Sequence, residues 1–92
     1  MKDSNFNNIQ VRKVSIFLQE YLKVNHIDFL TADECASLLA ENSILSNEIR
    51  PKPGFNFRQM LRDGRDHKIS LVDGASQKRP KTRWHINRKE NL

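Results

Sequence analysis

The amino-acid sequence predicts a small α+β domain in which three helices are followed by an antiparallel β-hairpin. In the first half of the chain, apolar residues recur at spacings of three and four, which is typical of helices. Near the C-terminus, two short segments instead alternate apolar and polar residues, as strands do. The length of 92 residues corresponds to one domain near the lower end of the usual size range.

The composition excludes several classes of protein. Hydrophobic residues make up 37% of the chain and charged residues 29%, which is typical of a compact, very polar module. No apolar run approaches the roughly 18 residues that a membrane-spanning helix needs. The N-terminal residues lack the apolar stretch of a signal peptide, so we expect a cytoplasmic protein. The single cysteine, Cys35, excludes an internal disulfide framework and any zinc site built from several cysteines.

Positive charge is concentrated in the second half of the chain. Residues 1–49 carry four basic and seven acidic side chains, a net charge of −3, whereas residues 50–92 carry twelve basic and four acidic side chains, a net charge of +8. A basic half joined to an acidic half indicates a surface suited to a polyanion. The simpler explanation is that the basic residues only keep the protein soluble.

The first helix is expected to begin at Ile9 and to end near Asn25, where asparagine tolerates the left-handed conformation that stops helices. Asn7 and Gln10 have the spacing of a reciprocal N-terminal cap. The polar residues 1–8 are expected to form a flexible arm.

A short strand at residues 27–30 would have to pair with a strand elsewhere in the chain. Thr31 and Glu34 then form a capping box, so a second helix is expected from there to about Asn42. Residues 43–53 form a connector, because its two prolines oppose continuous helix.

A third, short helix is expected at residues 56–63, with an apolar face formed by Phe57, Met60 and Leu61. In this interpretation Asn56 is the N-cap and Gln59 completes its capping box. Gly64 would end the helix in the left-handed conformation.

The C-terminal third predicts a hairpin with strands at Ile69–Leu71 and Trp84–Ile86. The polar segment 73–82 between them is a long basic loop. Because Trp84 alternates with Ile86, we expect its side chain in the core rather than stacked on a nucleic-acid base. The folded domain would span residues 9–87, with a charged tail at 88–92.

The order of these elements resembles that of the winged helix-turn-helix superfamily over residues 9–87. Two features carry the resemblance: the segment Gly54–Gly64 in the position of a recognition helix, and Lys78-Arg-Pro-Lys81 in the position of a wing. The resemblance implies that the protein binds double-stranded DNA, as a transcriptional regulator or as the DNA-binding module of a larger protein. Helix 56–63 would enter the major groove, and the wing 73–82 would contact the backbone.

Residue types near the third helix suit these roles. Arginine matches the base edge of guanine, and asparagine or glutamine matches that of adenine. Long basic side chains position a protein on phosphates. The candidate base-reading residues are Asn56, Arg58, Gln59 and Arg62. The candidate backbone contacts are Arg50, Lys52, Arg65, Lys68, Lys78, Arg79, Lys81 and Arg83.

The main alternative is that the polar face of the third helix is an ordinary solvated surface, in which Gln59 pairs with Asp63 and Arg62 with Asp66. A protein-binding adaptor or an RNA-binding module using the same basic surface also remains open. We expect no enzymatic activity, because no carboxylate pair or nucleophile has an apolar setting. No metal site or cofactor is expected, and the target sequence, effector and oligomeric state are left open.

Overall fold

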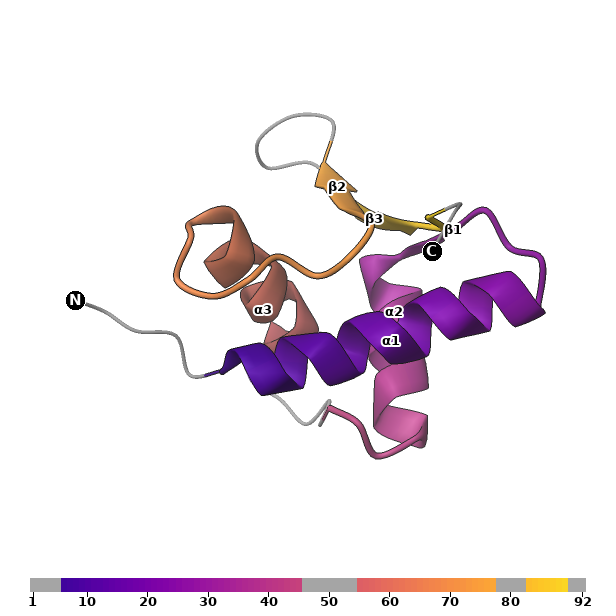
Figure 1. Ribbon diagram of the computed structural model, residues 1–92, viewed down its shortest axis with the longest axis horizontal. Helices are drawn as coiled ribbons and strands as arrows, with labels where there is room; N and C mark the ends of the chain where they lie inside the picture. The colour runs from indigo at the N-terminus through magenta and orange to yellow at the C-terminus, as the bar shows by residue number, and fades with distance from the viewer. Residues whose placement is uncertain (1–5, 46–54, 78–82, 90–92) are drawn as a thin grey trace.

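The computed structural model describes residues 6–45, 55–77 and 83–89. These residues form three helices and a three-stranded antiparallel sheet (Figure 1), which confirms the α+β class. None of the helices in the described ranges combines the length and apolar character needed to cross a membrane. In chain order the elements are α1 (Asn8–Val24), β1 (Phe29–Thr31), α2 (Ala32–Glu41), α3 (Phe55–Arg65), β2 (Ala75–Gln77) and β3 (Trp84–Asn87).

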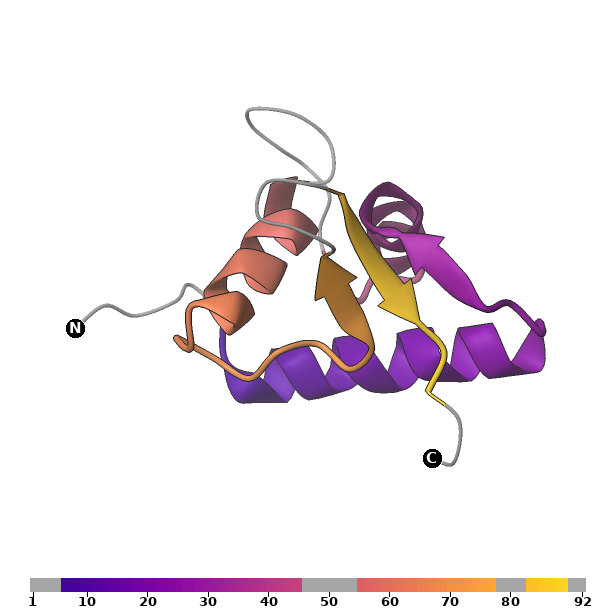
Figure 2. The same ribbon diagram turned by 90° about the horizontal axis from the view of Figure 1, so that it is seen from above.

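The sheet lies on one side of the helices and has the strand order β1-β3-β2 (Figures 1 and 2). Ile86 in the central strand is paired with Leu30 of β1 and with Ala75 of β2. The short segment after the first helix therefore finds the distant strand that its length required.

The core lies between the sheet and the inward faces of the three helices. Trp84 and Ile86 of β3 are buried, whereas His85 between them is only half-buried. Trp84 therefore packs in the core, as the alternation predicted. The other large buried side chains of the helices and strands include Leu18, Leu22, Leu30, Leu39, Phe57, Met60 and Leu61.

Two of the three N-terminal capping boxes predicted from the sequence, those at Asn7 and Thr31, are present. The backbone N–H of Gln10 donates to Asn7 Oδ1, and the backbone N–H of Asn7 donates to Gln10 Oε1, each over 2.9 Å. The Glu34 amide donates to Thr31 Oγ1 over 3.3 Å, and the Thr31 amide donates to Glu34 Oε1 over 2.9 Å. Each cap satisfies two backbone donors that the helix itself leaves without a partner.

The first two helices end where the sequence predicted, with Asn25 and Asn42 as their C-caps, but the residue in the left-handed conformation after α1 differs from the prediction. Among the described residues other than glycine, those in the left-handed conformation are His26, Ser43 and His67, whereas Asn25 has a φ of −95°. After α3, the His67 amide donates to the Gly64 carbonyl and the Lys68 amide to the Asp63 carbonyl, which is the Schellman arrangement.

The predicted roles of Asn56 and Gly64 are wrong. Because α3 begins at Phe55, Asn56 lies inside the helix rather than at its N-cap. Gly64 also lies inside the helix, where a Cβ would approach within 2.8 Å of Leu71 Cα. Glycine is therefore needed there for the close approach of the following segment rather than for a left-handed turn.

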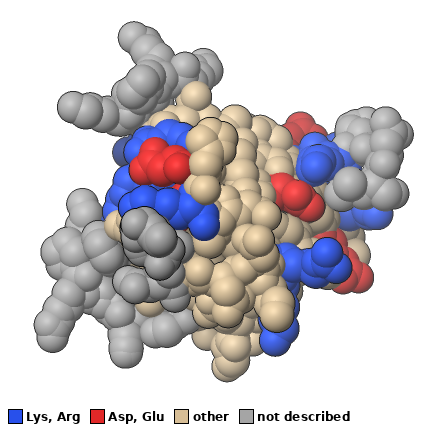
Figure 3. Space-filling model, turned by 60° about the vertical axis from the view of Figure 1, so that its left-hand side comes forward, with Lys and Arg blue, Asp and Glu red and all other residues tan. Residues whose placement is uncertain are grey.

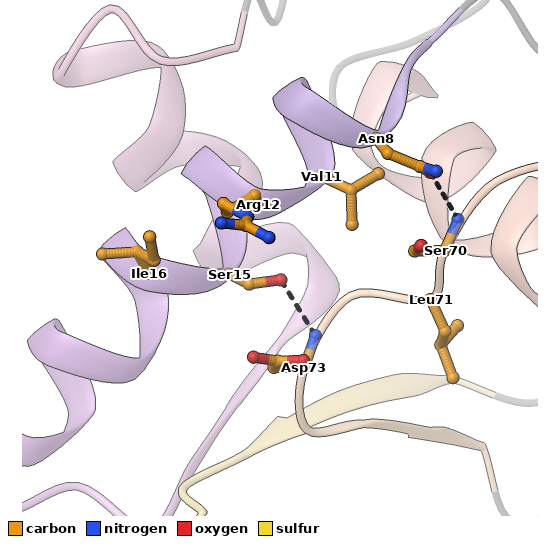
Figure 4. A pocket seen from close by; sticks show the side chains of 8 residues that line it. All are labelled: Asn8, Val11, Arg12, Ser15, Ile16, Ser70, Leu71 and Asp73. Atoms are coloured by element: carbon orange, nitrogen blue, oxygen red, sulfur yellow. Dashed lines mark hydrogen bonds between the residues drawn. The ribbon is translucent and has the colours of Figure 1, made fainter. Parts of the chain in front are cut away.

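The prediction of a strand at residues 69–71 is also wrong, because the strand paired with β3 is Ala75–Gln77. Side chains of α1 instead accept hydrogen bonds from backbone N–H groups of the segment that precedes β2. The Ser70 amide donates to Asn8 Oδ1 over 2.8 Å, and the Asp73 amide donates to Ser15 Oγ over 3.0 Å (Figure 4). As a consequence, the hairpin begins later than predicted, and residues 73–77 of the expected wing belong to a turn and to β2.

Gln19 of α1 connects the helix to the hairpin. The residue is 5% exposed, its Nε2 donates to the Asp73 and Asn87 carbonyls, and its Oε1 accepts from the Lys89 backbone amide. Arg88 also contacts the domain, since Nη2 lies 3.1 Å from Asp28 Oδ1. Arg88 and Lys89, which the sequence assigned to a charged tail, therefore make contacts with the folded domain.

Candidate nucleic-acid interface

Helix α3 has an apolar and a polar face. Phe57, Met60 and Leu61 are at most 1% exposed, so this face belongs entirely to the core. Arg58 and Arg62 are half-buried, and only part of each side chain reaches solvent. The helix is thus fixed to the domain by one face while its guanidinium groups lie on the other.

Arg58 is held by the second helix. Its Nη1 lies 2.6 Å from Asp33 Oδ1, and the Arg58 and Asp33 side chains are 21% and 74% exposed. Asp33 stands in the first turn of α2, where a negative charge also suits the positive end of the helix dipole. The contact brings a carboxylate beside a side chain predicted to read bases, and its sequence separation of 25 residues gave no local signal.

Gln59 and Arg62 form a hydrogen-bonded chain with a buried carboxylate. Gln59 Nε2 donates to Asp63 Oδ1 over 2.8 Å, and Arg62 Nη2 donates to Gln59 Oε1 over 2.7 Å. Asp63 is only 4% exposed. This arrangement contains the Gln59–Asp63 contact of the solvated-face alternative, whereas Asp66 pairs with Arg65.

The remaining candidate residues are divided between described and undescribed parts of the chain. Asn56 is half-buried within α3. Among the backbone candidates, Arg65, Lys68 and Arg83 are exposed. Five further backbone candidates lie outside the described residues: Arg50, Lys52, Lys78, Arg79 and Lys81.

The charges of the described surface are mixed. On the face shown in Figure 3, Lys and Arg form separate groups that have acidic side chains beside them, and uncharged residues cover much of the area between. The described ranges hold ten basic and eight acidic side chains, whereas the rest of the chain holds six basic and three acidic ones. More than half of the net positive charge is therefore carried by residues outside the described ranges.

Cys35 is a core residue rather than a reactive group. Burial raises the pKa of its thiol to about 12, with a smaller contribution from the negative charge of Glu34. The thiol is thus protonated at neutral pH, as expected for a small buried hydrophobe. In the part of the chain that the structure describes, no group of three or more potential metal ligands is present.

Comparisons of the chain with protein-family models, with curated proteins and with solved structures gave no match.

Proposed function

We propose that this domain binds double-stranded DNA through α3 and the β2–β3 hairpin. The observation that supports the proposal best is the two-faced character of α3. Its apolar side chains anchor it in the core, while Arg58, Gln59 and Arg62 stand on its polar side. In the proposed complex α3 enters the major groove, where arginine and glutamine can each make two hydrogen bonds to one base.

The Arg58–Asp33 ion pair is compatible with this role because breaking it costs little free energy. Asp33 is 74% exposed, and exposed ion pairs contribute only about 0–1 kcal/mol to stability. A phosphate or a guanine edge could therefore replace the carboxylate as the partner of the guanidinium.

The hairpin would supply phosphate contacts. Lys78, Arg79 and Lys81 follow β2 directly in the sequence, and Arg83 immediately precedes β3. Lysine and arginine side chains next to a reading helix fix its register on the duplex without reading the sequence.

A protein-binding adaptor is the second candidate, and one specific observation favours it. Arg58, Gln59 and Arg62 all have polar partners within the chain. A surface whose hydrogen bonds are already made gains less from contact with DNA, because those bonds must first be exchanged.

A competition experiment separates these functions. A fluorescently labelled mixed-sequence DNA duplex is bound to the protein and then displaced by unlabelled duplex, single-stranded DNA or an RNA hairpin of equal length. We expect the duplex to compete best. Stronger competition by the RNA hairpin would favour the RNA-binding alternative, and the absence of any complex at low salt would contradict nucleic-acid binding.

A further inference from the structure

The outward face of α1 carries three exposed apolar side chains. Ile9, Ile16 and Val24 are 68%, 58% and 67% exposed. Their spacings of seven and eight residues correspond to about two helical turns each, so they form a stripe along the helix. This stripe is opposite the side chains of α1 that enter the core, such as Val14 and Leu18.

Nothing in the described chain covers this stripe. Figures 1 and 2 show α1 along one side of the molecule, with the sheet and the other two helices behind it. Large apolar side chains kept in water along a whole helix are typical of an interaction surface.

Two opposite charges, Lys13 and Glu20, lie nearest the centre of the stripe, and two further exposed basic side chains, Arg12 and Lys23, lie along its edge. Lys13 and Glu20 are both exposed, and neither takes part in an ion pair with another residue of the described ranges. Seven residues separate them, a rise of about 10 Å along the helix, so they are too far apart to pair with each other.

We propose that this stripe binds the same stripe of a second copy of the chain, with the two α1 helices antiparallel. In a two-fold arrangement centred beside Ile16, Lys13 faces the partner's Glu20, and Ile9 faces the partner's Val24. The contact between Lys13 and the partner's Glu20 then occurs twice, as a self-complementary two-fold interface requires. The complementary charges are what select a second copy over a lipid surface or an unrelated apolar peptide.

The surface beside the stripe can accept the side chains of such a partner. A shallow groove between α1 and the segment 70–73 has Ile16 on one wall and Leu71 on the other (Figure 4). A second groove runs from Ile16 towards Val24. Both grooves have Ile16 in their lining, so this side chain lies where the two adjoin, and side chains packed into grooves are the usual contact of helix pairs.

The interface is small, because α1 is about 25 Å long and contributes most of the contact. We therefore expect a dimer that dissociates on dilution rather than an obligate one. Its formation does not depend on DNA, so it can be measured without nucleic acid and separately from the proposed function.

Sedimentation velocity of the full chain over a wide concentration range tests this inference. We expect Ile16→Glu to remain monomeric at concentrations where the parent dimerises. Lys13→Glu and Glu20→Lys should each weaken association about tenfold, because each places two like-charge contacts in the dimer. The double variant K13E/E20K should recover the parent affinity.

Glu41→Lys, a charge reversal at the end of α2, is the matched control and should dimerise like the parent. Circular dichroism on each variant shows whether the fold is kept. A parent that stays monomeric, a dimer insensitive to Ile16→Glu, or a double variant no tighter than the single ones would overturn the inference.

Discussion

Arg58 of α3 and Asp33 of α2 are joined by an ion pair in which Nη1 lies 2.6 Å from Oδ1. The pair links the first turn of α2 to the beginning of α3. It also places a negative charge beside a guanidinium that the proposed function assigns to base reading. Asp33 would thus compete with DNA for Arg58.

Asp33→Asn should therefore strengthen duplex DNA binding severalfold, because the competing negative charge is removed. The free energy of unfolding should fall by no more than about 1 kcal/mol, from the exposed ion pair and the helix dipole together. Fluorescence anisotropy and urea unfolding measure the two effects. Glu41→Gln, at the opposite end of α2, is the control. An unchanged or lower DNA affinity of folded Asp33→Asn would show that Arg58 does not contact DNA.

Phe57→Ala and Arg58→Ala should have opposite effects although the two residues are neighbours. Truncation of the buried Phe57 should cost about 3–5 kcal/mol of stability. Arg58→Ala should leave the fold nearly intact and relax the preference for one base pair by about 1–3 kcal/mol. Thermal unfolding and binding to selected and random duplexes distinguish the two variants. If Arg58→Ala bound both kinds of duplex as the parent does, α3 would not be the reading element.

Gln59→Ala is a less specific test of base reading. Its amide donates to the buried Asp63, so its loss should also reduce stability by about 0.5–1.5 kcal/mol. Its effect on base preference is interpretable only at a temperature where the variant is fully folded.

Gly64→Ala should destabilise the domain, by about 1–3 kcal/mol, because the added Cβ would lie 2.8 Å from Leu71 Cα. Helix propensity alone would favour alanine by about 1 kcal/mol. Urea unfolding decides between the two effects. A more stable Gly64→Ala variant would mean that the segment at Leu71 moves away without cost.

Cys35 should be unreactive towards a thiol-specific reagent in the native state at pH 9. Burial raises the pKa of the thiol from 9.0 to about 12, so little thiolate forms at that pH. The unfolded chain ionises near the ordinary value, and its thiol should react rapidly in urea. Since the folded pKa is the higher one, this thiol should reduce stability progressively as the pH rises above about 9. Rapid labelling without unfolding would contradict the burial of Cys35.

The sequence could predict those parts of the fold that are decided within a few residues. The caps at Asn7 and Thr31 are of this kind, because each is completed by a side chain three positions later. The burial of Trp84 followed from alternation alone.

Contacts between distant residues account for the predictions that are wrong. The segment 69–71 has the alternation of a strand, but Asn8 binds its backbone from 62 residues away. Gly64 has the composition of a helix stop, but its role depends on Leu71. At the candidate interface, residue types suggested the chemistry of Arg58, whereas its partner Asp33 became visible only in the structure.

The salt dependence of duplex DNA binding is the sharpest test of whether this domain binds DNA through the hairpin and α3. The affinity for a mixed-sequence duplex is measured by anisotropy at increasing salt, for the parent and for a variant with Lys78, Arg79 and Lys81 all replaced by alanine. We expect the parent's affinity to fall steeply with salt, and the slope of log affinity against log salt to be lower by about 0.9 for each lost phosphate contact in the variant. Parent protein that fails to bind duplex even at low salt would contradict DNA binding, and a variant that keeps the parent's slope would show that the hairpin does not contact the phosphates.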